Sequence, residues 1–217
     1  MASKALGQKR QAVAVIGDGG MTAGLAFEAL NHLGACGADV IVVYNDNDMS
    51  ISENVGGLRN LSARLVQKIS ETAESSDWRP RDLPPASESA THLPDPEHFF
   101  AALGLKYQGP VDGHDLGALH EAFEQAKNEG GPQLIHALTV KGRGFEPAED
   151  KPITWHAVTR FDPVTGEAPP AVAKAPSYSE IFGDWLCSAV KRNSRIFGIT
   201  PAMREGSGMV RFAEEHP

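Results

Sequence analysis

Two short polar segments, each placed at the end of an apolar run, contain the residue types that could hold a metal ion. Gly17-Asp18-Gly19-Gly20 follows the run Ala12–Ile16, and Asn45-Asp46-Asn47 follows the next apolar run. A carboxylate from Asp18 and an amide oxygen from Asn47 suit Mg²⁺, which takes about six oxygen ligands and often keeps phosphate oxygens among them. The glycines would let backbone amides approach a phosphate. The pattern predicts a metal ion that holds a diphosphate.

The sequence around these two segments predicts a strand, a helix and a second strand, which would position them. Ala12–Ile16 and Asp39–Tyr44 are continuous apolar runs, typical of strands buried on both faces. Residues 21–34 between them have apolar residues at helical spacing, and Gly34 is the expected C-cap. Short joints make this a βαβ unit with parallel strands, whose carboxyl ends are where open α/β sheets bind ligands. The expected fold class is therefore α/β.

The rest of the chain extends the same pattern. Further elements are expected as helices at 58–69, 96–104 and 116–128 and as strands at 106–109 and 132–140. Asp112 or Asp115 should cap the third of these helices, which gives His114 a structural place in the turn before it. The loop 141–145 leaves the carboxyl end of the last strand, so Lys141 and Arg143 could steer a phosphate or be ordinary solvated charges.

The composition divides the chain into two parts joined by a linker. Residues 1–161 should form a diphosphate-binding domain, with a mobile excursion at about 57–94 that is rich in Ser, Pro and Asp. The proline-rich residues 162–177 are typical of a linker. Residues 178–217 should begin a second α/β domain, with a helix at 178–191, a strand at 195–199 and another helix from Pro201.

Charge and hydrophobicity exclude several classes of partner. The formal net charge of −8 argues against a nucleic-acid partner. No apolar stretch has membrane-spanning length, and residues 1–10 lack the apolar core of a signal peptide. We expect a cytoplasmic protein.

Other phosphate-binding motifs do not match the glycine segment. The dinucleotide fingerprint needs a glycine where Thr22 stands, and the P-loop needs Gly-Lys-Ser/Thr, whereas Gly24 is followed by Leu25. The plain alternative is that Asp18 only caps a helix and the glycines only turn the chain. The presence of Asn47 at the end of the next strand argues against that alternative.

The paired segments resemble the thiamine diphosphate and magnesium motif of the transketolase-like enzymes. Within these enzymes the chain is similar to the 1-deoxy-D-xylulose-5-phosphate synthases. The similarity rests on residues 17–19, 27–31, 45–56, 109–115, 141–149 and 200–208. It covers roughly four fifths of the chain and is weakest at 57–94. The resemblance implies a thiamine diphosphate-binding α/β fold and a reaction that condenses pyruvate with glyceraldehyde 3-phosphate and releases carbon dioxide. That reaction feeds isoprenoid, thiamine and pyridoxal synthesis.

The resemblance also implies roles for the residues of the two segments. Asp18, Asn47 and the backbone carbonyl of Met49 would bind Mg²⁺. Gly19, Gly20 and Asn47 would contact the diphosphate.

Two residues further along receive roles from the resemblance alone. Phe145 stands where the family often has tyrosine, so its ring would lie against the cofactor without a hydroxyl contact. His156, in Thr154-Trp155-His156-Ala157, matches a family histidine thought to assist proton transfer near the thiazolium. Without the resemblance, a lone histidine beside a tryptophan is more often a structural group.

The resemblance covers only part of the family's pattern. Family members have over a hundred residues before the first strand, and their essential glutamate comes after the place matching Pro217. We therefore expect a fragment truncated at both ends, inactive alone, from an enzyme that works as a homodimer. The alternatives are one subunit of a split transketolase-like enzyme and a non-catalytic cofactor-binding module.

Overall fold

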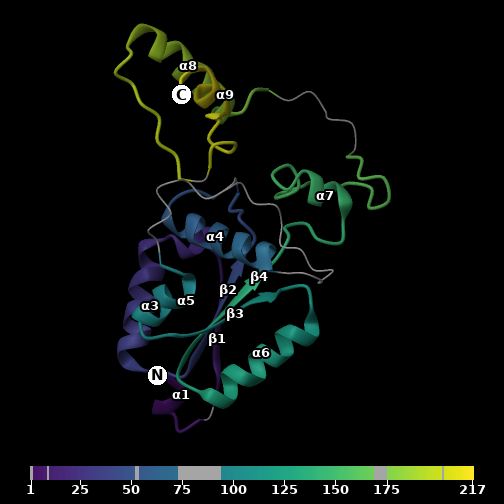
Figure 1. Cartoon of the computed structure of the whole chain (residues 1–217). Coiled ribbons are helices and arrows are strands. Elements are labelled where there is room, and N and C mark those ends of the chain that lie inside the picture. The colour runs from purple at the N-terminus through teal and green to yellow at the C-terminus, as the bar shows by residue number, and fades with distance from the viewer. Residues whose placement is uncertain (1, 9, 52–53, 73–93, 169–174, 202) are drawn as a thin grey trace. The chain divides into compact units, whose positions relative to one another are not determined.

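The computed structural model describes residues 2–8, 10–51, 54–72, 94–168, 175–201 and 203–217 (Figure 1). They form two compact units, one made of residues 1–50 and 54–143 and the other mainly of residues 144–217. Most of the predicted excursion and part of the predicted linker lie outside the described residues. The predicted division at 162–177 therefore stays a prediction.

The first unit is built on a sheet of four parallel strands. They are β1 (Ala12–Gly17), β2 (Val40–Asp46), β3 (Lys106–Asp112) and β4 (Pro132–Leu138), in the order β1-β2-β4-β3. The central strands β2 and β4 are buried along nearly their whole length, which explains why their sequences are continuous apolar runs. The expected α/β class with a parallel sheet flanked by helices is confirmed.

Helices cover both faces of this sheet (Figure 1). The helices of the first unit are α1 (Ala2–Ala5), α2 (Asp18–Met21), α3 (Gly24–Cys36), α4 (Gly57–Thr72), α5 (Pro96–Ala102) and α6 (Leu116–Glu129). One core cluster joins α2, α3 and α5 to the sheet through Met21, Leu30 and Phe100, while α6 packs its alanines against the other face. None of the described helices is long and apolar enough to cross a membrane.

The edge strand β1 is less covered than its neighbours. It pairs with β2 on one side, and no described strand pairs with it on the other. Val13 and Val15, on the face that α6 covers over β2 and β4, are 50% and 71% exposed. No residue of β1 is buried on either face, so the prediction of a first strand buried on both faces was wrong.

The helix predicted at 21–34 begins and ends at other residues in the structure. A separate short turn, α2, comes first, and α3 then runs to Cys36 with Gly37 as its left-handed C-cap at φ 59°. Gly34 is inside the helix, so its prediction as the C-cap was wrong. A Cβ at Gly34 would lie 1.7 Å from the carbonyl oxygen of Leu103, so close packing against the end of α5 requires the glycine.

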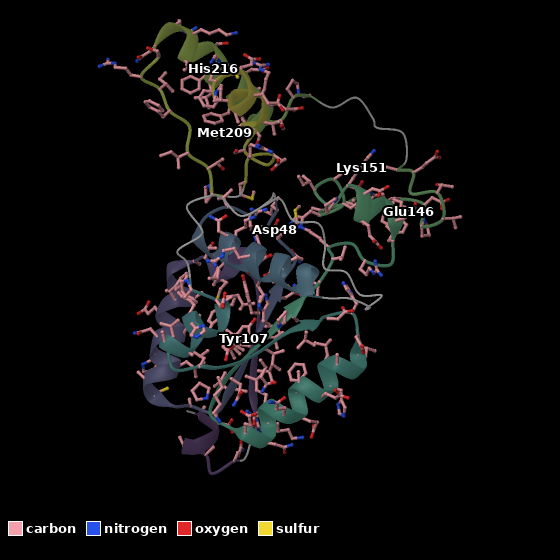
Figure 2. The ribbon with its side chains drawn as sticks, in the orientation of Figure 1. Asp48, Tyr107, Glu146, Lys151, Met209 and His216 are labelled. Atoms are coloured by element: carbon pink, nitrogen blue, oxygen red, sulfur yellow. The ribbon has the colours of Figure 1, made fainter. Side chains whose placement is uncertain are left out.

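The second unit contains α7 (Glu146–Asp150), α8 (Tyr178–Arg192) and α9 (Val210–Glu215). Its small core joins α8 to α9 through Leu186, Cys187, Met209 and Phe212, and Figure 2 shows Met209 beside α9. The strand predicted at 195–199 was wrong, because no described strand of this unit is available to pair with it. The helix predicted from Pro201 begins only at Val210.

Candidate metal centre

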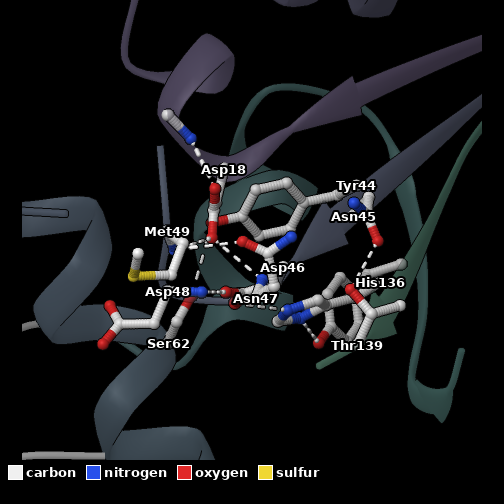
Figure 3. Close-up of polar contacts among 12 residues, drawn as sticks. Asp18, Tyr44, Asn45, Asp46, Asn47, Asp48, Met49, Ser62, His136 and Thr139 are labelled. Carbon is white, nitrogen blue, oxygen red and sulfur yellow. Dashed lines mark hydrogen bonds and ion pairs between the residues drawn. The ribbon is translucent and has the colours of Figure 1, made fainter. Parts of the chain in front are cut away.

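The register between β1 and β2 brings the two predicted ligand segments together. Gly17, the last residue of β1, pairs with Asn45 near the end of β2. Asp18 therefore lies beside the turn formed by residues 46–49, as Figure 3 shows. The Asp18 side chain is almost fully buried there, with 4% of its residue surface exposed.

The carboxylate of Asp18 accepts hydrogen bonds from three backbone amides. Its Oδ1 accepts from the N–H of Gly19 at 2.7 Å. Its Oδ2 accepts from the N–H of Asn47 at 2.9 Å and from that of Met49 at 3.2 Å. Asp18 is the first residue of α2 rather than its N-cap, which is Gly17 and has no side-chain bond. Simple helix capping therefore does not account for this carboxylate, which is bonded across to the next strand.

The side-chain amide oxygen of Asn47 points to the same backbone amide as the carboxylate of Asp18. The N–H of Met49 also lies 3.0 Å from Asn47 Oδ1, so this one amide contacts oxygens of both predicted ligand side chains. A carboxylate oxygen and an amide oxygen thus converge at one point, which is the donor set that Mg²⁺ prefers.

The turn that carries Asn47 and Met49 has an unusual backbone. Asp48 has a positive φ of 57°, the only such value among the described non-glycine residues. Its N–H donates to Asp46 Oδ1 at 3.3 Å, and its carboxylate is held by Arg59 of α4, with Nε to Oδ1 at 3.1 Å. The left-handed residue lets the amides of Asn47 and Met49 both face Asp18.

Three buried carboxylates, those of Asp18, Asp46 and Asp48, stand close together, and the last two are paired with the side chains of His136 and Arg59. Burial and the neighbouring charge of Asp46 raise the pKa of Asp18, although hydrogen bonds from Asn47, Asn54 and Gly19 oppose the shift. Burial acts to raise the pKa of Asp46 too, but the hydrogen bond and electrostatic interaction with His136 hold that pKa below its ordinary value. Burial and the charge of Asp46 thus disfavour the ionised form of Asp18, and a cation placed there would stabilise it.

Gly19 and Gly20, which follow Asp18, leave little room for a side chain. A Cβ at Gly19 would lie 2.7 Å from Cβ of Ser50, and one at Gly20 would lie 3.3 Å from Cγ1 of Ile16. Lys141, at the end of β4, donates from Nζ to the carbonyl oxygen of Ser50 at 2.5 Å. Burial lowers the pKa of Lys141, while the charge of Asp18 opposes that change. A cationic side chain and a glycine therefore both contact the segment that follows the turn.

Among the described residues, no group of three or more His, Cys, Asp or Glu side chains could hold a metal. The predicted set is of another kind, because it has one carboxylate, one amide oxygen and one backbone carbonyl. Its members come from the ends of two parallel strands. This arrangement agrees with ligands that leave several positions of the ion for phosphate and water.

Comparison with known proteins identifies the family. The family model described as 1-deoxy-D-xylulose-5-phosphate synthase matches residues 1–139. The chain belongs to this family. The synthase of Edwardsiella ictaluri is 49% identical over the whole chain, and that of Pseudoalteromonas translucida is 47% identical. The synthase of Shewanella woodyi is 48% identical over 96% of the chain. The chain spans about a third of the length of these relatives, 36% of the first two and 35% of the third.

The two remaining residues with roles implied by the synthase family lie in the second unit. Phe145 precedes α7, and its ring packs edge-on against Trp155 with 4.9 Å between centroids and tilted against Phe161 at 5.9 Å. His156 is exposed, and its N–H donates to the carbonyl of Ile153 at 3.3 Å in a turn. These residues form a local aromatic cluster with a histidine at its edge, and their roles toward a cofactor stay predictions.

Sequence reasoning missed the buried polar residues behind the metal centre. His136 of β4 is fully buried, and Nε2 donates to Asp46 Oδ2 at 2.9 Å. Tyr107 of β3 contacts the other ring nitrogen. A histidine in the middle of the mostly apolar run 132–140 was the available signal, because a buried polar side chain requires partners. In contrast, the expected helix cap is present, since Asp115 accepts from the N–H groups of Gly117 and Ala118.

Proposed function

We propose that this chain binds Mg²⁺ and, through it, the diphosphate of thiamine diphosphate at the carboxyl ends of β1 and β2. The observation that carries the proposal is the meeting of Asp18 Oδ2 and Asn47 Oδ1 at the N–H of Met49. The raised pKa of Asp18 supports it, because a buried carboxylate beside Asp46 is stabilised by a cation.

The proposed ligands of the ion are Asp18, Asn47 and the carbonyl oxygen of Met49. The backbone at Gly19 and Gly20, together with the side chain of Asn47, would contact the diphosphate. In the second unit, Phe145 would provide a ring contact to the cofactor. His156 would assist proton transfer at the reacting carbon, and its exposure leaves the ring accessible.

The activity proposed for the complete enzyme follows from the family name. It joins pyruvate to glyceraldehyde 3-phosphate, with loss of carbon dioxide, to give 1-deoxy-D-xylulose 5-phosphate. Thiamine diphosphate, when bound, supplies an electron sink for the carbon that pyruvate contributes. A cytoplasmic homodimer is the proposed form of the complete enzyme, with no nucleic-acid or membrane partner.

Binding without turnover is the proposed behaviour of this chain alone. The relatives that share the family name are nearly three times as long, so this chain matches only one part of a synthase. An assay with pyruvate, glyceraldehyde 3-phosphate, thiamine diphosphate and Mg²⁺ should give no product above background. Clear product formation by the purified chain would contradict this part of the proposal.

Isothermal titration calorimetry tests the binding site directly. Thiamine diphosphate should bind the chain with Mg²⁺ present and should not bind when the metal is chelated. Asp18→Ala should weaken binding at least about 100-fold, because it removes a direct ligand to the ion. Asp39→Ala is the matched control, since this exposed aspartate lies just before β2, at the end of the strand away from the turn. Equal affinity of the two variants would refute the site.

The affinity should also depend on pH in a defined direction. Protons and Mg²⁺ compete for the carboxylate of Asp18, whose pKa is raised by burial and by Asp46. Binding should therefore weaken as the pH falls through this raised pKa, at a higher pH than an ordinary aspartate would give. Titrations at several pH values would measure the midpoint.

A further inference from the structure

A row of hydrogen-bonded, buried side chains from three strands leads to the turn of the metal centre. Tyr107 of β3 joins its hydroxyl to His136 Nδ1 at 2.7 Å, and His136 Nε2 contacts Asp46 Oδ2 at 2.9 Å. His136 has no exposed surface and Asp46 has 4%. The strand order β2-β4-β3 makes their strands neighbours, and the register places Asp46 and Tyr107 diagonally to His136, each offset by two residues.

Burial makes this arrangement costly unless every polar atom has a partner. Both ring nitrogens of His136 have one, and the ring also packs 4.7 Å from that of Tyr44. The neighbouring β4 residues on the same face, Leu134 and Leu138, are apolar and buried. An apolar side chain could fill the place of His136, so its polar contacts require another reason than packing.

This row of contacts ends at the turn 46–49. Asp46 uses Oδ2 for His136 and Oδ1 to accept the N–H of Asp48 at 3.3 Å. Its backbone carbonyl accepts from the N–H of Thr139 at 2.8 Å. Asp46 is thus fixed at three atoms, and the left-handed residue Asp48 comes two positions later, after Asn47. The residues on either side of Asp48 are the ones whose amides face Asp18.

We propose that His136 is a positioning residue: held by Tyr107 at one ring nitrogen, it fixes the carboxylate of Asp46 with the other and so aims Asn47 and Met49 at Asp18. This inference rests on the proposed function for its use, since Asn47 and Met49 are the proposed ligands. The positioning of the turn by His136 is a property of the metal-free chain, so it can be tested without a ligand. Residues behind metal ligands typically change metal affinity about 10- to 100-fold when they are removed.

Two substitutions separate the two contacts of His136. The amide nitrogen of glutamine lies as many bonds from the β-carbon as Nε2 of histidine, so His136→Gln keeps a donor for Asp46. The amide of asparagine corresponds instead to Nδ1, so His136→Asn keeps a partner for Tyr107 and leaves Asp46 without its donor. Both variants retain a polar amide in the same buried place.

Gln133→Met is the control for a general loss of core contacts. Gln133 lies on the same strand, is also fully buried, and donates to the carbonyl of Gly130 at 2.8 Å at the end of β4 away from the turn. Tyr107→Phe supplies a milder variant if His136→Asn does not fold, because it removes only the hydroxyl that holds His136 Nδ1.

Amide hydrogen exchange of the metal-free chain is the deciding measurement. In His136→Asn the amides of Asn47 and Met49 should exchange at least about 10-fold faster than in the parent, beyond any change at the central β2 amides Val42 and Val43. In Gln133→Met they should follow those central amides, whereas His136→Gln, which keeps a donor for Asp46 but loses the contact with Tyr107, should accelerate them less than His136→Asn does. In Tyr107→Phe an intermediate acceleration is expected.

The inference is overturned if the Asn47 and Met49 amides accelerate no more than Val42 and Val43 in His136→Asn or Tyr107→Phe. A second arm titrates Mn²⁺ with thiamine diphosphate, where His136→Asn should weaken binding about 10-fold or more. If the parent binds neither, the proposed function fails, while the exchange result still decides whether His136 positions the turn.

Discussion

The metal centre and the aromatic cluster around Phe145 hold their predicted residues in different ways. At the metal centre, the buried side chain of Asp18 and the half-buried side chain of Asn47 both accept from the backbone amide of Met49, in a turn at the end of the adjacent strand. In the aromatic cluster, the ring of Phe145 packs on Trp155, while His156 is exposed. Strand register fixes the first geometry across residues far apart in the sequence, whereas contacts between near neighbours fix the second.

The sharpest way to break this comparison is to remove one side chain from each region. Asn47→Ala should weaken Mg²⁺-dependent binding of thiamine diphosphate by about 10- to 100-fold, because the ion loses a ligand and the diphosphate a contact. His156→Ala should change the dissociation constant less than about 2-fold, because its proposed role is in proton transfer. Calorimetric titration of both variants measures the difference, and similar losses would show that the two regions contribute alike to binding.

A glycine at the metal centre gives the next largest effect. Gly19→Ala places a Cβ 2.7 Å from Cβ of Ser50 and should lower the free energy of unfolding by about 1–3 kcal/mol. Binding should weaken as well, because the turn 46–49 and Ser50 must move. Adding Ser50→Gly removes the colliding atoms and should restore most of the stability in urea denaturation. No recovery in the double variant would mean that the close approach is not the cause.

The aromatic cluster should respond in stability rather than in binding. Trp155→Ala removes edge contacts with Phe145 and Phe161 and should lower the free energy of unfolding by about 1–3 kcal/mol, since each of the two pairs contributes ~0.5–1.5 kcal/mol beyond its buried area. The affinity for Mg²⁺ and thiamine diphosphate should stay within about 2-fold. Urea denaturation followed by circular dichroism measures the first quantity, with Trp155→Phe as the control that keeps a ring.

The smallest effect is expected from adding a hydroxyl to Phe145. Phe145→Tyr should leave both the unfolding free energy and the affinity nearly unchanged, because the half-buried ring keeps its contacts with Trp155 and Phe161. A gain in affinity of about 10-fold, measured by the same titration, would instead mean that the hydroxyl reaches a bound group.

The sequence was sufficient to predict the elements that bring the ligands together. Strands β2 and β4 are continuous apolar runs, and the parallel crossover follows from the short joints around α3. It was not sufficient for the turn itself, because residues 45–48 are all Asn or Asp, which tolerate a left-handed backbone, and their types do not single out Asp48. The partners of Asp46 depend on a strand order that places β4 between β2 and β3, which local patterns do not contain.

The wrong predictions have a common physical origin. The apolar residues at 195–199 suit a strand, but a strand forms only where another can pair with its backbone. Gly34 suits a helix end, but its place is set by the approach of the Leu103 carbonyl from a distant segment. In both cases a contact far along the chain, or its absence among the described residues, overrode a local preference.

The half-covered strand β1 has a practical consequence for anyone handling this chain. Strand β1 is an open sheet edge, and its side chains Val13 and Val15 are 50% and 71% exposed. An extended segment of another molecule can pair with such an edge. The eight excess negative charges oppose such stacking by mutual repulsion, and added salt weakens that repulsion. Dilute, low-salt solutions should therefore keep the preparation clear, whereas concentrating it in high salt should favour fibrous precipitates.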